Sequence, residues 1–327
     1  MAVVLGHNQY GKAENRVVRV FRDRDPHELV DYNVSVALSG GQEAPHLTGD
    51  NSPTLPTDTQ KNTVYAFAAE DDAVAQPESF GTRLARHFVD NTEPITWARV
   101  RLEMYPWSRL GNPHAFVRDG RYVRTATVTY DGSATRVVSG VKDLVLLKTT
   151  DSEFWGYLQD RYTTLAPTND RVMATSLLAQ WYHTSDDVDW GKSYDTVLSA
   201  LQDTFGGHHS LALQHTLYEM GSAVLAGQPQ IAEIRFSAPN KHHFVYDLAR
   251  FDLENDNEVF HADDRPYGLI EATVRREDAP DPGQVFDPAV AIGTRGSGRG
   301  TSTVPASSSF SSIRSTDFTA YGTTGWS

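Results

Sequence analysis

The sequence of 327 residues contains no cysteine. Disulfide bonds, thiolate metal sites and cysteine nucleophiles are therefore excluded. No apolar run approaches the roughly 18 residues that a membrane-spanning helix requires. The N-terminal residues lack a basic stretch followed by an apolar core, so we expect no signal peptide. A reducing, cytoplasmic location is compatible with these absences.

Positive charge is also scarce, with 29 lysines and arginines against 42 acidic residues and a formal net charge of -13. Because nucleic acid demands a net basic face, this balance argues against DNA or RNA as the main ligand. A small anion stays possible where a few basic side chains gather. Hydrophobic residues make up 39% of the chain, enough for a sizeable core, and the length predicts two domains or one large one.

The first half of the chain is dominated by strand patterns. Alternation of apolar and polar residues predicts half-buried antiparallel strands, which we place at residues 15–22, 27–38, 62–69, 96–104 and 140–150. One helix is expected at about 77–90, where Pro77 suits the first helical position and apolar residues recur every four positions. Asp119-Gly120 is typical of a hairpin turn.

The second half repeats this plan. Strands are predicted at residues 171–184, 231–239, 242–250 and 267–276, and helices at about 186–205 and 211–226. Strands, helices and strands, twice over, predict an α+β protein with antiparallel sheets. No repeat is visible in the sequence itself. The last segment, residues 281–327, is rich in Gly, Ser and Thr and is expected to be a disordered tail.

Polar and aromatic residues at element boundaries are candidates for chemistry: Lys12, Thr57, Asp58, Phe154, Arg171, Gln214, Asn240 and His242. Taken singly, each has a structural reading, since Thr57 and Asp58 could cap their own backbone and Phe154 could lie in a core. Taken together, an aromatic face, a guanidinium and a carboxamide suit a flat, anionic heterocycle.

Metal chemistry finds little support in the sequence. His242 and His243 are adjacent in an extended segment and should point to opposite faces, so they cannot grip one metal together. No HExxH motif occurs. A lysine, a threonine and a histidine could instead form a relay that moves protons.

Seven segments carry a resemblance to a known family. They are VLGHNQYGK, TDTQKNTVYAFA, SEFWGYLQDRYTTL, DRVMAT, LALQHTLYEMG, PNKHHF and RPYGLIEATVRR, in this order. The chain from about residue 3 to 276 resembles urate oxidase (uricase). This resemblance implies a cofactor-free oxidase of purine catabolism, which converts urate, O2 and water to 5-hydroxyisourate and hydrogen peroxide.

The resemblance also implies a fold and an assembly. It implies two tandem tunnelling-fold (T-fold) domains, which we place at residues 1–138 and 139–280, each an antiparallel sheet backed by helices. Two subunits would form a barrel, and two barrels a homotetramer with active sites between subunits. The segment 104–116 could not be matched, and the chain does not end in the peroxisomal Ser-Lys-Leu, so we expect a cytoplasmic enzyme.

Roles follow from the resemblance, position by position. Arg171 and Gln214 look like the pair that grips urate, and Phe154 like the aromatic ring on which urate stacks. Leu213 and Asp58 would bind urate through backbone groups, and Asn240 would hold the dioxygen or water site. The implied proton relay consists of Lys12, Thr57 and His242.

Two other functions stay open. One is a metal-dependent cyclohydrolase of the same fold, which would need a zinc site that the sequence does not suggest. The other is a purine-binding protein without turnover, against which the complete set Lys12, Thr57 and His242 argues.

Overall fold

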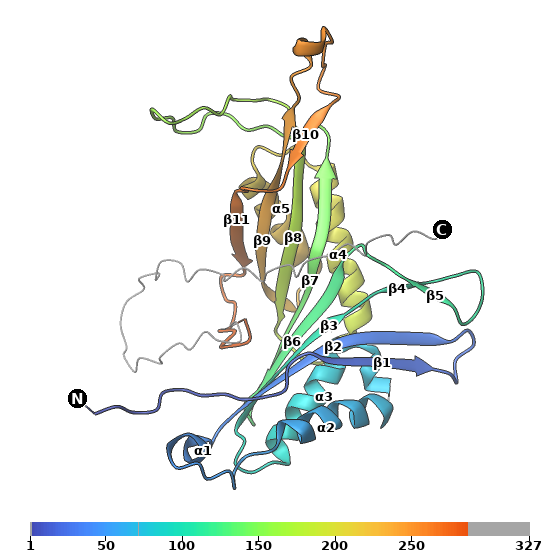
Figure 1. Ribbon diagram of the computed structural model, residues 1–327, viewed down its shortest axis with the longest axis vertical. Coiled ribbons are helices and arrows are strands. Elements are labelled where there is room, and N and C mark those ends of the chain that lie inside the picture. Colours follow the sequence, from blue (N-terminus) through green and yellow to red (C-terminus); the bar gives the residue numbers. More distant parts are fainter. Residues whose placement is uncertain (1, 71, 287–327) are drawn as a thin grey trace, which may run out of the picture. The chain divides into compact units, whose positions relative to one another are not determined.

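The computed structural model describes residues 2–70 and 72–286 (Figure 1). The elements of the first half are β1 (Asn15–Phe21), β2 (Glu28–Ser39), α1 (Glu43–Leu47), α2 (Thr57–Glu70), η1 (Asp72–Ala75), α3 (Pro77–Asp90), β3 (Trp97–Met104), β4 (Trp107–Arg109), β5 (Phe116–Arg118) and β6 (Val123–Tyr130). Those of the second half are β7 (Thr135–Lys148), β8 (Met173–His183), α4 (Trp190–Gly207), α5 (Leu213–Gly227), β9 (Ile231–Val245), η2 (Ala249–Phe251), β10 (Phe260–Asp263) and β11 (Leu269–Arg275). None of these helices is long and apolar enough to cross a bilayer.

The strands repeat one plan twice within a single sheet. Its first half runs in the order β1-β2-β3-β6 and its second half in the order β7-β8-β9-β11, with β6 paired to β7 and every pairing antiparallel. In each half, two long helices lie between the second and third strands in chain order, α2 and α3 in the first half and α4 and α5 in the second; the first half also carries the short α1 and η1 there. This arrangement confirms the α+β class with antiparallel strands and helices. The short hairpin β4–β5 and strand β10 are additions to the repeated plan.

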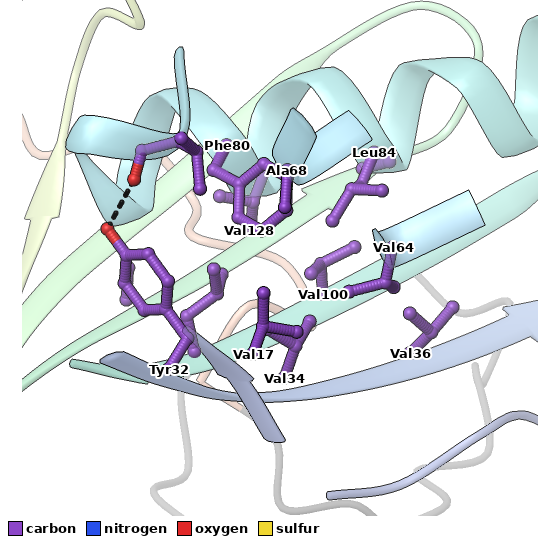
Figure 2. Close-up of a cluster of buried hydrophobic side chains, with 14 of the residues drawn as sticks. Val17, Tyr32, Val34, Val36, Val64, Ala68, Phe80, Leu84, Val100 and Val128 are labelled. Carbon is purple, nitrogen blue, oxygen red and sulfur yellow. Dashed lines mark hydrogen bonds between the residues drawn. The ribbon is translucent and has the colours of Figure 1, made fainter. Parts of the chain in front are cut away.

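The first core lies between the sheet and helices α2 and α3. Successive turns of the helices contribute apolar side chains on one face. These side chains meet the inward-facing residues of the strands, since every second strand residue points to the same face. Figure 2 shows this packing, with Val64, Ala68, Phe80 and Leu84 against Val17, Val34, Val36, Val100 and Val128. The hydroxyl of Tyr32 donates to the carbonyl of Val74 at 2.7 Å, so that this buried polar group is satisfied (Figure 2).

A second core lies under helices α4 and α5. It includes Trp181, Val197, Leu201, Phe205, Leu217, Val224 and Ile234. Gly221 permits close approach of α5 to the sheet, because a Cβ there would lie 2.6 Å from a methyl carbon of Val274. Along β7, Val137 belongs to the first core and Val141 to the second. The predicted domain boundary at 138/139 falls between them, inside a continuous strand, and stays a prediction.

The two halves share a buried polar network. Arg124 of β6 donates to Glu78 of α3 at 2.7 Å and to the carbonyl of Trp190 in α4 at 3.2 Å. The hydroxyl of Ser139 donates to Glu78 at 2.6 Å and lies 3.0 Å from Nε2 of His183. Burial lowers the pKa of His183 to about 3, so the ring is neutral when folded. The network therefore ties α3 and β6 to β7, β8 and α4.

The prediction of a strand at 62–69 is wrong. These residues belong to α2, whose buried positions Gln60, Val64 and Ala68 recur every four residues. The local run of β-branched and aromatic residues favours a strand, but packing against the sheet selects the helix. Tyr65, on the outer face, donates its hydroxyl to the carbonyl of Arg16 at 2.9 Å.

The hairpin predicted at Asp119-Gly120 is also wrong. Strand β5, just before this dipeptide, pairs with β4, whereas β6 pairs with β3 and β7. The carboxylate of Asp119 instead accepts from the backbone N–H and the guanidinium of Arg121. The reversal between paired strands lies earlier, where the N–H of Leu110 donates to the carbonyl of Ala115 at 2.9 Å.

The strands predicted at 231–239 and 242–250 form one strand, β9, which ends at Val245. It stays continuous because it pairs successively with β11 and with β10 along one side. Val285 is buried against Val138 and Tyr182, so the packed chain extends beyond the predicted boundary at 280. The rest of the predicted tail, from residue 287, lies outside the described residues.

Candidate functional site

The segment that carries Lys12 continues the edge of the sheet beyond β1. Tyr10 exchanges two backbone hydrogen bonds with Leu38, and the N–H of Val36 donates to the carbonyl of Lys12 at 2.9 Å. The hydroxyl of Tyr10 accepts from the N–H of Leu55 at 3.0 Å. Because Leu55 precedes α2 by two residues, this bond ties the start of α2 to the segment that carries Lys12.

Thr57 and Asp58 open helix α2, not a strand as the sequence pattern indicated. The first N–H groups of a helix have no acceptor within it, so those of Thr57 and Asp58 are available to a ligand. The Asp58 carboxylate accepts a hydrogen bond from the ammonium of Lys61 at 2.5 Å and another from the side-chain amide of Asn62 at 3.0 Å. Lys61, and to a smaller extent the charge of Lys12, lowers the pKa of Asp58. Lys12, Thr57 and Asp58 therefore form a first group, which we call the polar group.

Phe154 and Arg171 lie together on the second half of the chain. Phe154 exchanges two backbone hydrogen bonds with Thr168, at 2.8 and 3.0 Å, which fix its backbone. The guanidinium carbon of Arg171 lies 5.2 Å from the centre of the Phe154 ring. Burial lowers the pKa of Arg171, and its Nε is buried with no hydrogen-bond partner. A buried guanidinium N–H beside an aromatic face calls for an acceptor from a ligand.

Leu213 and Gln214 open helix α5 beside the same segment. The N–H of Glu153 donates to the carbonyl of Ser210 at 2.8 Å, so the chain before Phe154 runs beside the chain before α5. No side chain caps this helix, and its first N–H groups are therefore available. Leu213 is buried, whereas Gln214 is exposed.

Asn240 and His242 lie on β9. Asn240 is paired with Thr175 of β8, four residues after Arg171, and its N–H donates to the carbonyl of Gly268 at 2.8 Å. His242 is paired with Asp263 of β10, and its ring stacks on Phe244 with centroids 5.5 Å apart. We call Phe154, Arg171, Leu213, Gln214, Asn240 and His242 the ring group.

Within the part of the chain that the structure describes, no hydrogen bond, ion pair or ring contact joins the polar group to the ring group. The structure thus places Arg171 beside Phe154, and the charge of Lys12 near enough to Asp58 to lower its pKa. That the remaining candidates join them in one site stays a prediction. Among the same residues, no three His, Asp or Glu side chains are placed to hold a metal ion.

Sequence reasoning missed Tyr157, whose ring stacks on Phe154 with centroids 4.8 Å apart and planes 15° apart. The signal was an aromatic residue three positions after Phe154, in a segment with no regular pattern. Two surface cavities, of about 460 Å³ beside Tyr218 and about 540 Å³ beside Arg86, contain no candidate residue. A site that is completed by a second chain need not form a cavity in one chain.

The candidate site combines an aromatic face, a desolvated guanidinium and two helix starts without a side-chain cap. Such a site suits a ligand with a flat, anionic ring.

The family model for uricase matches residues 8–129 and 137–271. Uricase from Arthrobacter globiformis is 49% identical over 276 residues, which are 84% of this chain and 91% of that protein. Uricase from Dictyostelium discoideum is 36% identical over 278 residues, 82% of this chain and 96% of that protein.

Solved structures agree. The crystal structure of the Arthrobacter globiformis uricase superposes with a TM-score of 0.83 at 48% identity, covering 86% of this chain and 97% of that one. Urate oxidase from Bacillus sp. TB-90, at 22% identity and a TM-score of 0.70, shares the fold. The chain belongs to the uricase family.

Proposed function

We propose that this protein is a urate oxidase that uses the polar group and the ring group as one site. Urate, O2 and water would give 5-hydroxyisourate and hydrogen peroxide, without a metal or organic cofactor. Two electrons pass from urate to O2, and water supplies the hydroxyl that adds to the ring. The observation that carries the proposal is the buried, unpartnered Nε of Arg171 beside the ring of Phe154.

The side chains of the ring group can account for urate binding. Phe154 offers its face to the flat purine, and Arg171 stays charged even though burial lowers its pKa. A charge-assisted pair in a desolvated place binds an anion more strongly than the same pair in water. Gln214 can donate and accept at an amide-like edge, and the N–H groups of Leu213 and Asp58 can donate from helix starts.

Chemistry requires an electron-rich substrate, because triplet O2 reacts slowly with closed-shell molecules. Removing a proton from urate supplies this reactivity, and Arg171 stabilises the negative charge that results. A hydroxyl is a weak base by itself, so Thr57 would act with Lys12 and His242 as a relay. Asn240 would hold O2 or water above the purine plane.

We further propose that the site forms between subunits. One chain leaves the polar group and the ring group without a mutual contact, and an interface would join them. In the described sheet, β1 pairs only with β2 and β11 only with β9, so both edges can accept a strand from another copy. Two chains would close a barrel, and two barrels would make a homotetramer.

Exposed apolar side chains support this assembly. The segment 155–167, which we call the arm, projects from the sheet between β7 and β8 (Figure 1). On it, Trp155 is 62% and Leu158 99% exposed. Phe244 and Val245, at the end of β9, are also exposed. Apolar surface of this kind is typical of interfaces. The cytoplasmic location stays a prediction, which cell fractionation would check.

One experiment tests the activity. Loss of urate absorbance, O2 uptake and peroxide formation are followed together, with and without a strong chelator. We expect one O2 consumed and one peroxide formed for each urate lost, unchanged by the chelator. Urate loss without O2 uptake would refute the oxidase. Loss of activity with chelator would favour the metal-dependent alternative, and binding without turnover the purine-binding protein.

A further inference from the structure

The ring of Phe154 has one face already covered. Tyr157 stacks on it nearly parallel, with planes 15° apart and centroids 4.8 Å apart. The Tyr157 hydroxyl donates to the carbonyl of Leu165 at 2.6 Å, which closes the arm on itself and holds the ring of Tyr157 in place. Tyr162 lies on the same arm but is 71% exposed, and the ring that stacks on Phe154 is that of Tyr157.

This contact supplies what the backbone of Phe154 cannot. The bonds to Thr168 fix the backbone, but they leave the ring free to rotate about its side-chain bonds. A stacked neighbour restricts this rotation, because offset parallel rings attract each other at this separation. The other neighbour, Arg171, is held by no hydrogen bond at its Nε and does not restrain the ring alone.

We propose that Tyr157 is a positioning residue of the urate site, whose ring supports one face of Phe154 and leaves the opposite face for the substrate. The inference rests on the proposed function. A ring offers two stacking faces, and Tyr157 fills one at stacking distance. A purine held by Arg171, whose guanidinium carbon lies over the same ring at 5.2 Å from its centre, would then stack on the other face, with the orientation of the Phe154 ring already set. Tyr157 acts on binding through Phe154 and takes no part in proton transfer.

The test compares three variants of the full-length enzyme. Y157L removes the ring, Y157F keeps the ring and removes the hydrogen bond to Leu165, and Y162L is the matched control on the same arm. We expect Y157L to raise the KM for urate about threefold to tenfold, the effect of one lost aromatic stack, with kcat within about twofold. Y157F should restore a KM near that of the wild type, and Y162L should leave KM unchanged.

Several results would overturn the inference. A lower KM in Y157L would mean that Tyr157 covers the face that urate uses. Equal KM values for Y157L and wild type, or equal damage by Y157F and Y157L, would assign no role to the stack. Should Y157L fail to assemble, Y157M removes the ring but keeps a long apolar side chain, and an unchanged KM there would equally contradict the proposal. Wild type that does not oxidise urate would refute the proposed function instead.

Discussion

The two halves of the sheet share a plan, but their candidate site residues lie at the starts of different helices. In the first half, the candidate residues Thr57 and Asp58 open α2, the first of the two long helices. In the second half, Leu213 and Gln214 open the second helix, α5. The other long helix of each half carries no candidate residue: α3 buries Glu78 in the network between the halves, and α4 starts at a capping aspartate. A repeated fold therefore does not fix where function lies.

The halves also differ in what they offer. The first presents hydroxyl, ammonium and carboxylate groups near the surface, which suit proton transfer. The second presents Phe154 with a partly desolvated Arg171, which suits binding. Under the proposed function, activity would therefore depend on assembly. The following predictions test this division, from the largest effect to the smallest.

Mixing two inactive variants tests whether one active site combines the polar group of one chain with the ring group of another. K12A and R171A should each be nearly inactive alone. Refolded together in equal amounts, they should regain about a quarter of wild-type activity, because random pairing makes about one site in four from intact halves. Peroxide formation measures this, and mixing two samples of K12A is the control. No recovery would place both halves of the site in one chain.

A substitution in the polar group should mainly lower kcat, and a substitution in the ring group should mainly raise KM. T57A should lower kcat by about 10²–10⁴, the contribution of general acid–base catalysis, with little change in KM. Q214A should mainly raise KM, by about tenfold to a hundredfold, since it removes one or two hydrogen bonds to an ionised ligand. Steady-state kinetics distinguish these outcomes. Full turnover in T57A with urate still bound would exclude the relay.

The network between the halves should make stability depend on pH. His183 has a pKa of about 3 when folded and about 6.5 when unfolded, so below pH 6.5 the unfolded chain binds a proton that the folded chain does not. Its contribution is present above pH 6.5 and is lost as the pH falls toward 3. Between pH 6.5 and 5 the free energy of unfolding should fall by about 2 kcal/mol.

His183→Gln should flatten this slope, and denaturant unfolding at several pH values measures it. His87→Gln is the control: burial also lowers the pKa of His87, but that ring is half-exposed, so a smaller change is expected. If the slope is unchanged in the His183 variant, the pH dependence of stability does not arise from protonation of this ring in the network between the halves.

The smallest effect concerns the cap of α4. Asp189 accepts from the N–H of Lys192 at 3.1 Å, so D189A should lower the free energy of unfolding by about 1 kcal/mol. D195A removes the same charge from an exposed position of the same helix and should have little effect. Denaturant midpoints compare the two, and equal losses would mean that charge and not capping matters.

Some elements were predictable because their pattern is local. The alternation at 15–22 and 27–38 and the four-residue spacing at 77–90 correspond to β1, β2 and α3. In each, burial of one face follows directly from the period of the backbone. The candidate site residues could likewise be named from motifs, although their roles stay predictions.

What the sequence by itself determined is the repeated order of strands and helices, the family, and the residue types of the site. Only the tertiary structure decided that 62–69 is a helix, that β5 turns to β4, and that Tyr157 lies on Phe154. Each of these depends on groups distant in the chain or on side-chain packing. Local propensities are worth tenths of a kcal/mol to about 1 kcal/mol per residue, and burial against the sheet outweighs them.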